Sequence, residues 1–456
     1  MSLIWGLLVP TALLCWILTP PGAGAMLRLL CLALAMGLGV GLTSCVWFAV
    51  HAGGAVSSVT DAVVEIGAVA LLALPLRGLR LAPATTRQAV LRGPTRWALP
   101  VLLVLVLTWA IAQAAEFASA PHGSWDAIAI WNLHARVLAA GPATWPGFFL
   151  PGETCAYHAD YPLLLPATVA RLWSFSGDTS PYVAAVVGAW LSAATVLLCG
   201  ATVGVLRGRG PALLAAVTLL GTGFFVRQSA TQYADVPLSY FMLAATAALV
   251  VAETTAERPA RWLGVAGLCA GLAAWTKNEG AQFAIVLIVV ATPVALQRGW
   301  RAEWRRVAAL LAGLLPGLAV LTYFKLTLAP ANDLVAGQNA ALLLHLLDPT
   351  RYAHIVIGLA RAIGRVAKVL LVALPLYAAA LGATRVAAGR RGARLTAIIY
   401  GLMLAGYFGV FLLTPKPLAW HLNTAAARLM LQLFPGALLA VFLAVAAPEE
   451  ASAAAG

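Results

Sequence analysis

Long apolar runs recur along this chain from end to end, and they constrain its fold more than any other feature. A helix needs about 20 predominantly apolar residues to cross a bilayer. Of the 456 residues, 62% are hydrophobic and 10% are charged, whereas soluble domains average about 25% charged residues. No polar stretch is long enough for a soluble domain of ordinary size. The sequence therefore predicts an all-α polytopic membrane protein whose first run is a span and not a cleaved signal peptide.

About 13 segments are predicted to cross the membrane. They are residues 3–19, 28–50, 58–76, 97–115, 181–206, 211–226, 236–252, 262–276, 281–297, 307–329, 363–384, 395–413 and 430–447. One further apolar segment, 162–175, is only roughly 21 Å long as a helix. We predict that this short segment is an interfacial or re-entrant helix that does not cross.

Basic residues cluster in the short loops between the predicted spans, and the net charge is +13. On a soluble protein such a charge suggests nucleic acid, but here it is a topology signal, so no nucleic-acid partner is expected. If 162–175 does not cross, the basic loops near residues 77–96, 207–209, 258–261, 298–306 and 385–394 all lie in the cytoplasm. The N-terminus is then outside and the C-terminus inside. The abundance of arginine and alanine fits a bacterial inner membrane.

The longest outer loop, 116–161, contains the segment GSWDAIAIWNLHARVL (123–138). Its apolar residues recur at steps of three and four, which predicts an amphipathic helix on the outer membrane surface. The stripe consists of Trp125, Ile128, Trp131, Ala135 and Leu138. Asp126 falls in the first turn, where the helix dipole favours a carboxylate. A plain helix-start aspartate and a catalytic carboxylate are both consistent with this position.

The same loop ends with AYHADYPLLLP (156–166), in which Pro162 suits the first turn of the short helix. Asp160 is therefore either a second helix-start acid or a second carboxylate of an outer site. His158 and Asp160 together would suit a divalent metal, but no third ligand is in view. No metal or other cofactor is predicted.

Further polar residues interrupt the apolar segments on the predicted outer side. Asp235 precedes a span, and WTKNEG places Lys277 and Glu279 between two short apolar runs. A lysine at that depth must be paired or solvated. Lys277 is therefore either part of a structural ion pair or a cation that awaits an anionic ligand.

The predicted outer loop 414–429 adds Lys416, Trp420, His421 and Arg428. Arg428 either snorkels to the surface or faces the same cavity as Lys277. Four further cations, Lys325, Arg361, Arg365 and Lys368, lie near predicted outer helix ends. Together these cations are more numerous than a solvated rim requires, and acids lie at the same level. This suggests a cavity that holds a phosphate beside a general base. Asp61 and Glu65 share one face of the third span, and a structural contact with a neighbouring span is the default interpretation.

Four of these motifs occur in an order that resembles the GT-C glycosyltransferases, especially the dolichyl-phosphate-mannose protein mannosyltransferases and the lipid A aminoarabinose transferases. SWDAIAIW stands where that family has its first acidic motif, and HADYPLLLP resembles its His-Pro-Pro-Leu element. YADVPLSYF resembles Leu-Asp-x-Pro-Leu-x-Phe, and GLAAWTKNEG resembles Gly-Leu-x-x-Leu-Thr-Lys-Gly. The resemblance covers residues 97–300 and, more loosely, the rest to 447.

The resemblance implies a GT-C-like helical bundle with outer juxtamembrane helices, divided into three parts. Residues 1–96 add N-terminal spans, 97–300 form the catalytic core, and 301–456 form C-terminal spans with outer loops 330–362 and 414–429. The chain departs from the family in having a single acid at Asp126 and in having Asn278 and Glu279 after Lys277. No outer soluble domain follows the last span, so the acceptor and a partner subunit are left open.

The resemblance also implies transfer of a sugar, with inversion, from a polyprenyl-phosphate donor to a glycan, lipid or protein acceptor on the periplasmic side. Asp126 would act as the general base, and Asp160 would support it or orient the acceptor. Lys277, Arg428 and Lys325 would bind the donor phosphate. The supporting residues would be Asp235, Glu279, His158, Trp125 and His421.

Two other classes share parts of this pattern. A polysaccharide polymerase or ligase uses the same substrate chemistry, and a transporter or flippase for a lipid-linked or anionic solute also carries outer cations. Transporters usually place charges near the midplane between repeated halves. This chain has no evident internal repeat, and its polar residues gather on one side.

Overall fold

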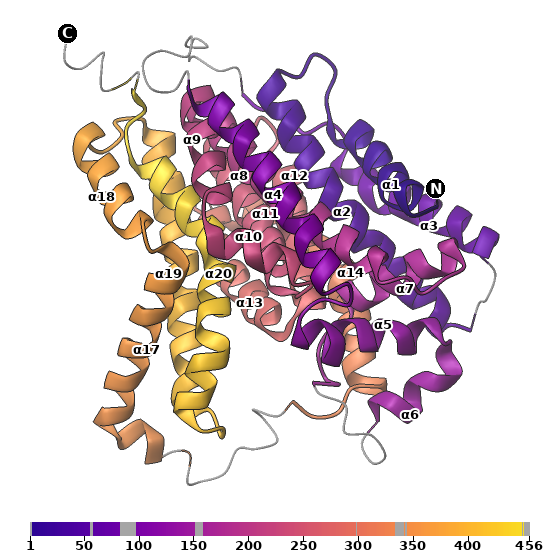
Figure 1. Ribbon diagram of the computed structural model, residues 1–456. Coiled ribbons are helices and arrows are strands. Elements are labelled where there is room, and N and C mark those ends of the chain that lie inside the picture. The colour runs from indigo at the N-terminus through magenta and orange to yellow at the C-terminus, as the bar shows by residue number, and fades with distance from the viewer. Residues whose placement is uncertain are drawn as a thin grey trace.

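The computed structural model describes residues 2–54, 58–82, 97–150, 158–297, 299–332, 342, 344–448 and 450, and all regular elements of this part are helices (Figure 1). The first half contains α1 (Ser2–Leu18), α2 (Ala25–Ala52), α3 (Ser58–Ala73), η1 (Leu74–Leu76), α4 (Ala98–Ser119), η3 (Ala127–Trp131), α5 (Asn132–Ala139), η4 (Pro142–Thr144), α6 (Trp145–Phe149), α7 (Leu164–Ser176), α8 (Tyr182–Arg207) and α9 (Arg209–Leu220). The second half contains α10 (Gly223–Ala230), α11 (Asp235–Thr254), α12 (Pro259–Thr276), α13 (Asn278–Ala295), α14 (Trp300–Thr327), η5 (Leu344–Leu347), α17 (Pro349–Ala367), α18 (Leu370–Leu381), α19 (Ala387–Leu413) and α20 (Leu418–Ala444).

Eight helices within the described ranges are long and apolar enough to cross a membrane, or nine if the bent pair α9 and α10 forms one span. The eight are α2, α4, α8, α11, α13, α14, α19 and α20. Shorter apolar helices include α1, α3 and α18. The prediction of a polytopic helical membrane protein is confirmed, but length and composition do not establish thirteen crossings.

The described parts of the basic loops predicted to share one side of the membrane meet at one end of the bundle, the upper end in Figure 1. Arg80, Arg207 and Arg209 line one cavity there together with Glu257 and Glu450. Glu253, at the end of α11, pairs with both Arg306 and Arg391. This arrangement agrees with the interpretation of 162–175 as a helix that does not cross. We call this the basic end of the bundle.

Two predicted spans differ from the structure because local breaks interrupt the apolar runs. The segment predicted at 211–226 forms α9 and α10, which are bent by 64° where Thr222, between Gly221 and Gly223, leaves the helical conformation. The segment predicted at 363–384 is divided at Lys368, where α17 ends and α18 follows after Val369. Glycine weakens a helix interior, and hydropathy alone does not register such breaks.

The predicted outer loops 330–362 and 414–429 contain long helical stretches. Helix α17 begins at Pro349, capped by the Asp348 side chain, and α20 begins at Leu418. Both beginnings are amphipathic, so their mean hydropathy is low although their residues are good helix formers. The bundle therefore extends as helix beyond the apolar segments at the end opposite the basic end.

The predicted helix 123–138 exists, but its apolar stripe is only half right. Trp131, Ala135 and Leu138 are buried, whereas Trp125 and Ile128 are more than half exposed. A π-helical turn, η3, occupies Ala127–Trp131. Its wider turn shifts the phase of the helix, so residues before it no longer share a face with those after it.

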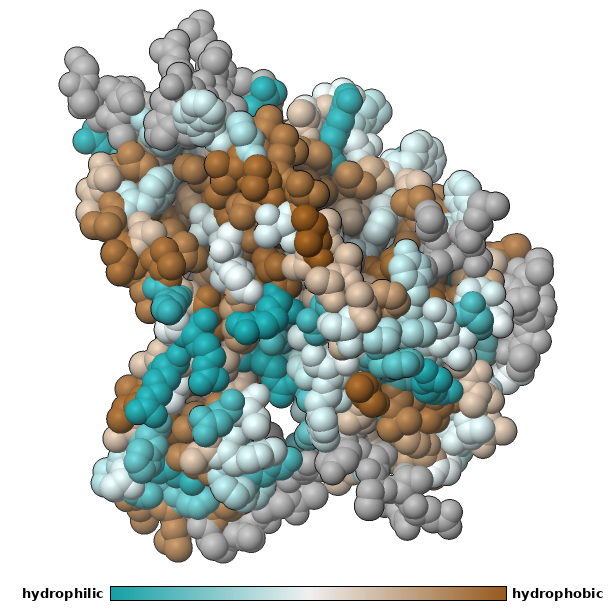
Figure 2. Space-filling model, viewed as in Figure 1, coloured by the Kyte–Doolittle hydropathy of each residue, from teal (hydrophilic) through white to brown (hydrophobic). Residues whose placement is uncertain are grey.

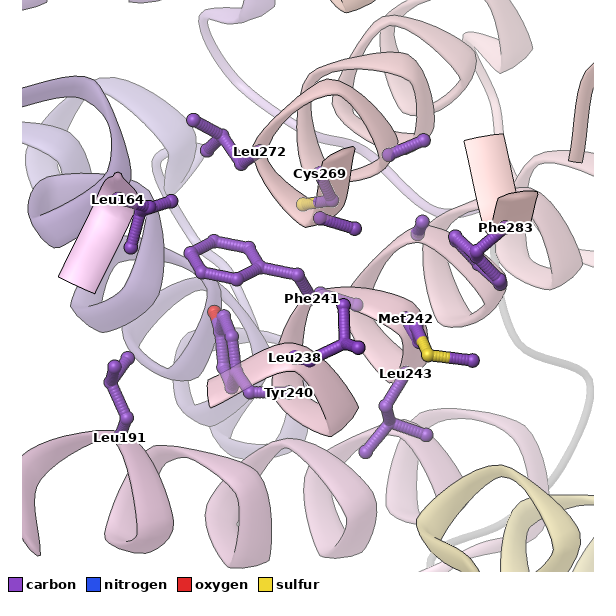
Figure 3. Close-up of a cluster of buried hydrophobic side chains, with 14 of the residues drawn as sticks. Leu164, Leu191, Leu238, Tyr240, Phe241, Met242, Leu243, Cys269, Leu272 and Phe283 are labelled. Carbon is purple, nitrogen blue, oxygen red and sulfur yellow. The ribbon is translucent and has the colours of Figure 1, made fainter. Parts of the chain in front are cut away.

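Helix α11 forms the centre of the bundle and is buried on every side. Tyr240 reaches into the neighbouring helix α2, where its hydroxyl donates to the Ala33 carbonyl at 2.8 Å. The residue that α2 presents to this ring is Gly37, where any side chain would collide with it. Figure 3 shows Tyr240 and Phe241 among aliphatic side chains of the surrounding helices. This packing fixes the start of α11, which carries Asp235.

Helices α12 and α14 approach each other closely through glycine. A Cβ at Gly313 would lie 2.2 Å from the Gly264 carbonyl oxygen, and one at Gly317 would lie 2.2 Å from that of Gly271. Small residues permit such close backbone contact between membrane helices. Because α12 leads directly into Lys277, this contact also fixes the position of that lysine.

Candidate active site

A polar cavity of about 340 Å³ lies at the end of the bundle opposite the basic end. It is lined by the segment before α7, the start of α13, the end of α19 and the first half of α20. The polar and aromatic lining residues are His158, Tyr161, Lys277, Asn278, Glu279, Gln282, Asn332, Tyr407, Lys416, Trp420, His421, Thr424 and Arg428. We call it the site cavity. Figure 2 shows a hollow and a band of hydrophilic side chains across the middle of the molecule, beneath a hydrophobic upper surface.

Asp126 and Arg428 form an ion pair between Nη1 and Oδ2, although the two residues lie 302 positions apart. The backbone N–H of Asp126 donates to the Tyr233 hydroxyl at 3.2 Å, and the Arg428 guanidinium lies 5.4 Å from the centre of the Tyr233 ring. The structure thus attaches the predicted first acidic motif to the last helix. Arg428 does not simply snorkel, because it lines the site cavity.

Asp235 connects this pair to Lys277. Its Oδ1 accepts from Lys277 Nζ at 3.0 Å and from Gln432 Nε2 at 2.6 Å, and its Oδ2 lies 3.8 Å from Arg428 Nη1. Lys277 also pairs with Glu279 at 2.9 Å. A continuous network of alternating charges therefore runs from Asp126 through Arg428, Asp235 and Lys277 to Glu279.

Lys277 remains a cation in this setting. Burial alone would lower its pKa, but the carboxylates of Asp235 and Glu279 outweigh burial and raise the pKa above the usual value. Its ammonium group also lies 5.9 Å from the centre of the Tyr161 ring. A charge-balanced lysine that lines a cavity is placed to attract an anion without being a buried unpaired charge.

Asp160 lies in a second cluster that adjoins the first. Its Oδ2 accepts from Asn278 Nδ2 at 2.8 Å and from Asn332 Nδ2 at 2.7 Å, and Lys325 Nζ lies 3.4 Å away. Lys325 also donates to the Asp160 carbonyl and, at 3.0 Å, to Asn278 Oδ1. Asp160 thus holds three separate segments together, and Asn278 connects this cluster to Lys277.

The three other predicted supporting residues have different surroundings. His158 has a left-handed backbone (φ 52°), and its ring stacks on Tyr161 with centroids 4.4 Å apart. His421 lines the site cavity, and its Nδ1 lies 3.0 Å from Thr414 Oγ1. Trp125 is 58% exposed and is not among the lining residues. His158 and His421 therefore share the site cavity with Lys277, whereas Trp125 lies outside it.

Several residues of the site were not predicted. Gln432 bonds both Asp235 and the Tyr407 hydroxyl, the latter at 2.6 Å. Asn332 donates to Asp160, and the Tyr233 hydroxyl accepts from the backbone N–H of Asp126. A lone amide within an apolar span has to find a partner, and this signal in LMLQLFP would have identified Gln432.

The predicted outer cations do not converge on one cavity. Lys277, Lys416 and Arg428 line the site cavity, and Lys325 contacts its wall through Asn278. Arg361 and Arg365 line a different cavity between α17 and α20.

Glu65 pairs with Arg171 of α7, as the default interpretation of a structural contact expected. The side chain of Asp61 lies outside the described residues. Among the described residues, no three His, Cys, Asp or Glu side chains gather as a metal site would require.

A helical membrane bundle with cations in one terminal cavity and carboxylates paired to them has the features of a GT-C glycosyltransferase. Residues 160–324 match the family model described as dolichyl-phosphate-mannose-protein mannosyltransferase. This stretch is a domain of that family, so the predicted resemblance is confirmed. The chain is a membrane glycosyltransferase whose donor is a polyprenyl-phosphate sugar. A search of curated proteins and one of solved structures return no match.

Proposed function

We propose that the site cavity transfers a sugar from a polyprenyl phosphate to an acceptor hydroxyl, with inversion, on the periplasmic side of a bacterial inner membrane. The observation that supports this most is the network from Asp126 through Arg428 and Asp235 to Lys277. Lys277 and Arg428 line the cavity, and Asp126, which is not among its lining residues, is joined to it through its ion pair with Arg428. A general base and an anion site within reach of one another are what this transfer requires.

In the proposed reaction, a carboxylate oxygen of Asp126 takes the proton of the acceptor hydroxyl while that oxygen attacks the anomeric carbon. The bond from the anomeric carbon to the phosphate oxygen breaks, and its electron pair leaves with the polyprenyl phosphate. Within the described residues, Oδ2 of Asp126 carries the ion pair, which leaves Oδ1 for the proton. A positioned base typically contributes about 10²–10⁴ in rate.

Lys277 and Arg428 would stabilise the charge that develops on the departing phosphate. Both line the cavity and both are already paired with carboxylates, so they are oriented before the donor arrives. Oriented charges cost no reorganisation during the reaction. Lys325 is directed at Asp160 and Asn278, so we assign it to the support of the cavity wall.

We assign Asp160 a positioning role and not a chemical one. Its Oδ2 already accepts from two amides and faces Lys325. Its removal would release Asn278, which directly follows Lys277. Glu279 and Asp235 would keep Lys277 charged and oriented, and His158 and His421 would shape the cavity for the sugar or the acceptor.

The proposed topology follows from the basic end. If that end is cytoplasmic, the positive-inside rule places the site cavity outside. The thirteen predicted crossings then correspond to the eight long helices, to α1, α3 and α12, to the bent pair α9–α10, and to α17 and α18 taken as one crossing. A cysteine scan with an impermeant reagent on intact cells tests this assignment at each end of the bundle.

The transfer is tested with pure protein and a labelled polyprenyl-phosphate sugar. Wild type is expected to release polyprenyl phosphate and Asp126→Asn to release almost none, while both elute as folded protein. Asp178→Asn is a matched control, because Asp178 is an exposed acid in the turn before α8. NMR of the product at the anomeric position tests inversion. Near wild-type release by Asp126→Asn would reject the catalytic assignment, and movement of intact donor across vesicles without release would favour transport.

A further inference from the structure

A second polar cavity, of about 500 Å³, lies between α17 and α20. Its lining residues are His354, Ile357, Gly358, Arg361, Ala362 and Arg365 from α17, and Leu418, Ala419, Leu422, Asn423 and Ala427 from α20. We call it the α17–α20 groove. It is distinct from the site cavity, because α20 contributes different residues to the two: Asn423 and Ala427 to the groove, and Thr424 and Arg428 to the site cavity.

Among the described residues, the two guanidinium groups of the groove have no counter-charge. Arg361 and Arg365 lie one turn apart on the same face of α17, an arrangement in which like charges repel. Neither has an ion pair with any described residue, and no acid is among the lining residues. By contrast, Arg171 and Arg428 each pair with a carboxylate. The groove is therefore an electropositive concavity.

Ordinary structural explanations do not account for both arginines. Arg365 lies in the last turn of α17, where the helix dipole favours a cation, but Arg361 lies one turn earlier. Packing does not require them either, since both arginines are exposed, whereas α17 is held to the bundle by buried residues such as Ile355, Leu359 and Val366. Both side chains border the groove and are exposed, so an incoming anion can reach them.

The donors in the groove suit a phosphate. An arginine presents N–H groups in a planar fork that matches two oxygens of a phosphate, and two forks one turn apart can hold one such group. The His354 ring on α17 and the Asn423 amide on α20 also line the groove and can add N–H donors.

The neighbouring surface suits a lipid. The chain continues from the groove into α18, which is apolar and exposes Val372 and Leu376. On the face shown in Figure 2, hydrophilic side chains form a band directly beneath the hydrophobic surface. We propose that the α17–α20 groove binds the phosphate of an anionic lipid headgroup at the edge of the hydrocarbon layer. This binding does not depend on the proposed transfer reaction.

Native mass spectrometry of the full chain in neutral detergent tests the proposal, with phosphatidylglycerol as the probe. Wild type is expected to retain the lipid, and Arg361→Gln/Arg365→Gln to bind about tenfold more weakly. Lys368→Gln is the matched control, because it removes a cation three residues beyond Arg365 that does not line the groove. Phosphatidylcholine, which has a phosphate but no net charge, is expected to bind more weakly than phosphatidylglycerol.

Competition with inorganic phosphate distinguishes the contribution of the headgroup from that of the acyl chains. If phosphate displaces phosphatidylglycerol from wild type, the anion alone suffices for the groove; if it does not, the acyl chains contribute as well, and either result supports the site. Arg361→Lys/Arg365→Lys controls for folding, since it keeps both charges and is expected to bind at an intermediate level. Equal weakening by Lys368→Gln, equal binding of the two lipids, or undiminished binding by the Gln double variant would overturn the proposal.

Discussion

Arg171 Nε lies 2.7 Å from Glu65 Oε2, and both side chains are buried. The pair joins α7 to α3, and Arg171 also donates to the Gly6 carbonyl of α1 at 3.1 Å. Helix α7 follows Asp160 in the sequence, so helices that precede the family domain hold in place a segment that contributes to the site. Glu65 does make a structural contact, as the default interpretation expected, but its partner lies in α7, the short segment predicted not to cross, and not in a predicted span.

Glu65→Ala is expected to destabilise the protein by about 3–5 kcal/mol, because a buried guanidinium then loses its partner. The loss should appear as a lower midpoint of thermal unfolding in detergent. The double variant Glu65→Leu/Arg171→Met, which removes both charges, should recover much of that loss. An equally unstable double variant would show that the loss does not come from the unpaired guanidinium.

Arg428→Ala is expected to lower kcat by about 10²–10³, since it removes a cation aimed at the departing phosphate and the partner of Asp126. Initial rates with a labelled donor measure this effect. Arg428→Lys keeps the charge but not the fork, so it should retain part of the rate. A kcat of Arg428→Ala close to wild type would exclude Arg428 from the chemistry.

Gln432→Leu is expected to slow transfer about tenfold without impairing membrane insertion. It removes one of the two hydrogen bonds at Oδ1 of Asp235, and a buried carboxylate that loses a partner is less well fixed. Thr396→Val is the control, because the Thr396 hydroxyl is buried but bonds only the Gly392 carbonyl of its own helix. Equal rates for the two variants would contradict the positioning of Asp235 by Gln432.

Lys277→Met is expected to lower the rate by the same factor at every pH between about 6 and 9. The raised pKa of Lys277 means that its contribution is fully present below the ordinary lysine value near 10.4 and is lost only above it. The donor, a phosphodiester, does not titrate in this range either. The ratio of the two pH profiles is the measurement, and a ratio that changes through this range would contradict a permanently charged Lys277.

Gly317→Ala is expected to destabilise the bundle by about 1–3 kcal/mol and to reduce donor binding, because α12 and α14 must separate. The donor KM reports the displacement of Lys277 at the end of α12. Gly409→Ala is the control, since a Cβ at that position on α19 meets nothing within 4 Å. Similar stability and KM for the two variants would argue against this coupling.

Hydropathy was sufficient to predict the helices because bilayer thickness imposes long apolar runs. It did not predict the bend between α9 and α10 or the early start of α20 at Leu418, since breaks and amphipathic turns change mean hydropathy little. The exposure of Trp125 follows from one π-turn, which simple periodicity assumes to be absent.

The site was predicted in part because charges are rare in membrane helices, so each one in the chain attracts attention. Asp126, Asp235, Lys277 and Arg428 do lie in one network. Which cavity each cation lines depends on the face of its helix and on helix packing, and the sequence alone did not assign Arg361 and Arg365 to a separate groove.

The stretch that matches the family contains Asp160, Asp235 and Lys277, but Asp126 precedes it and Arg428 follows it. Exchange of that stretch between relatives would move the lysine and leave behind the carboxylate–guanidinium pair. The network therefore depends on three separate regions of the chain at once. A graft that is to carry it intact must reach from the loop after α4 to the final helix, well beyond the matched stretch.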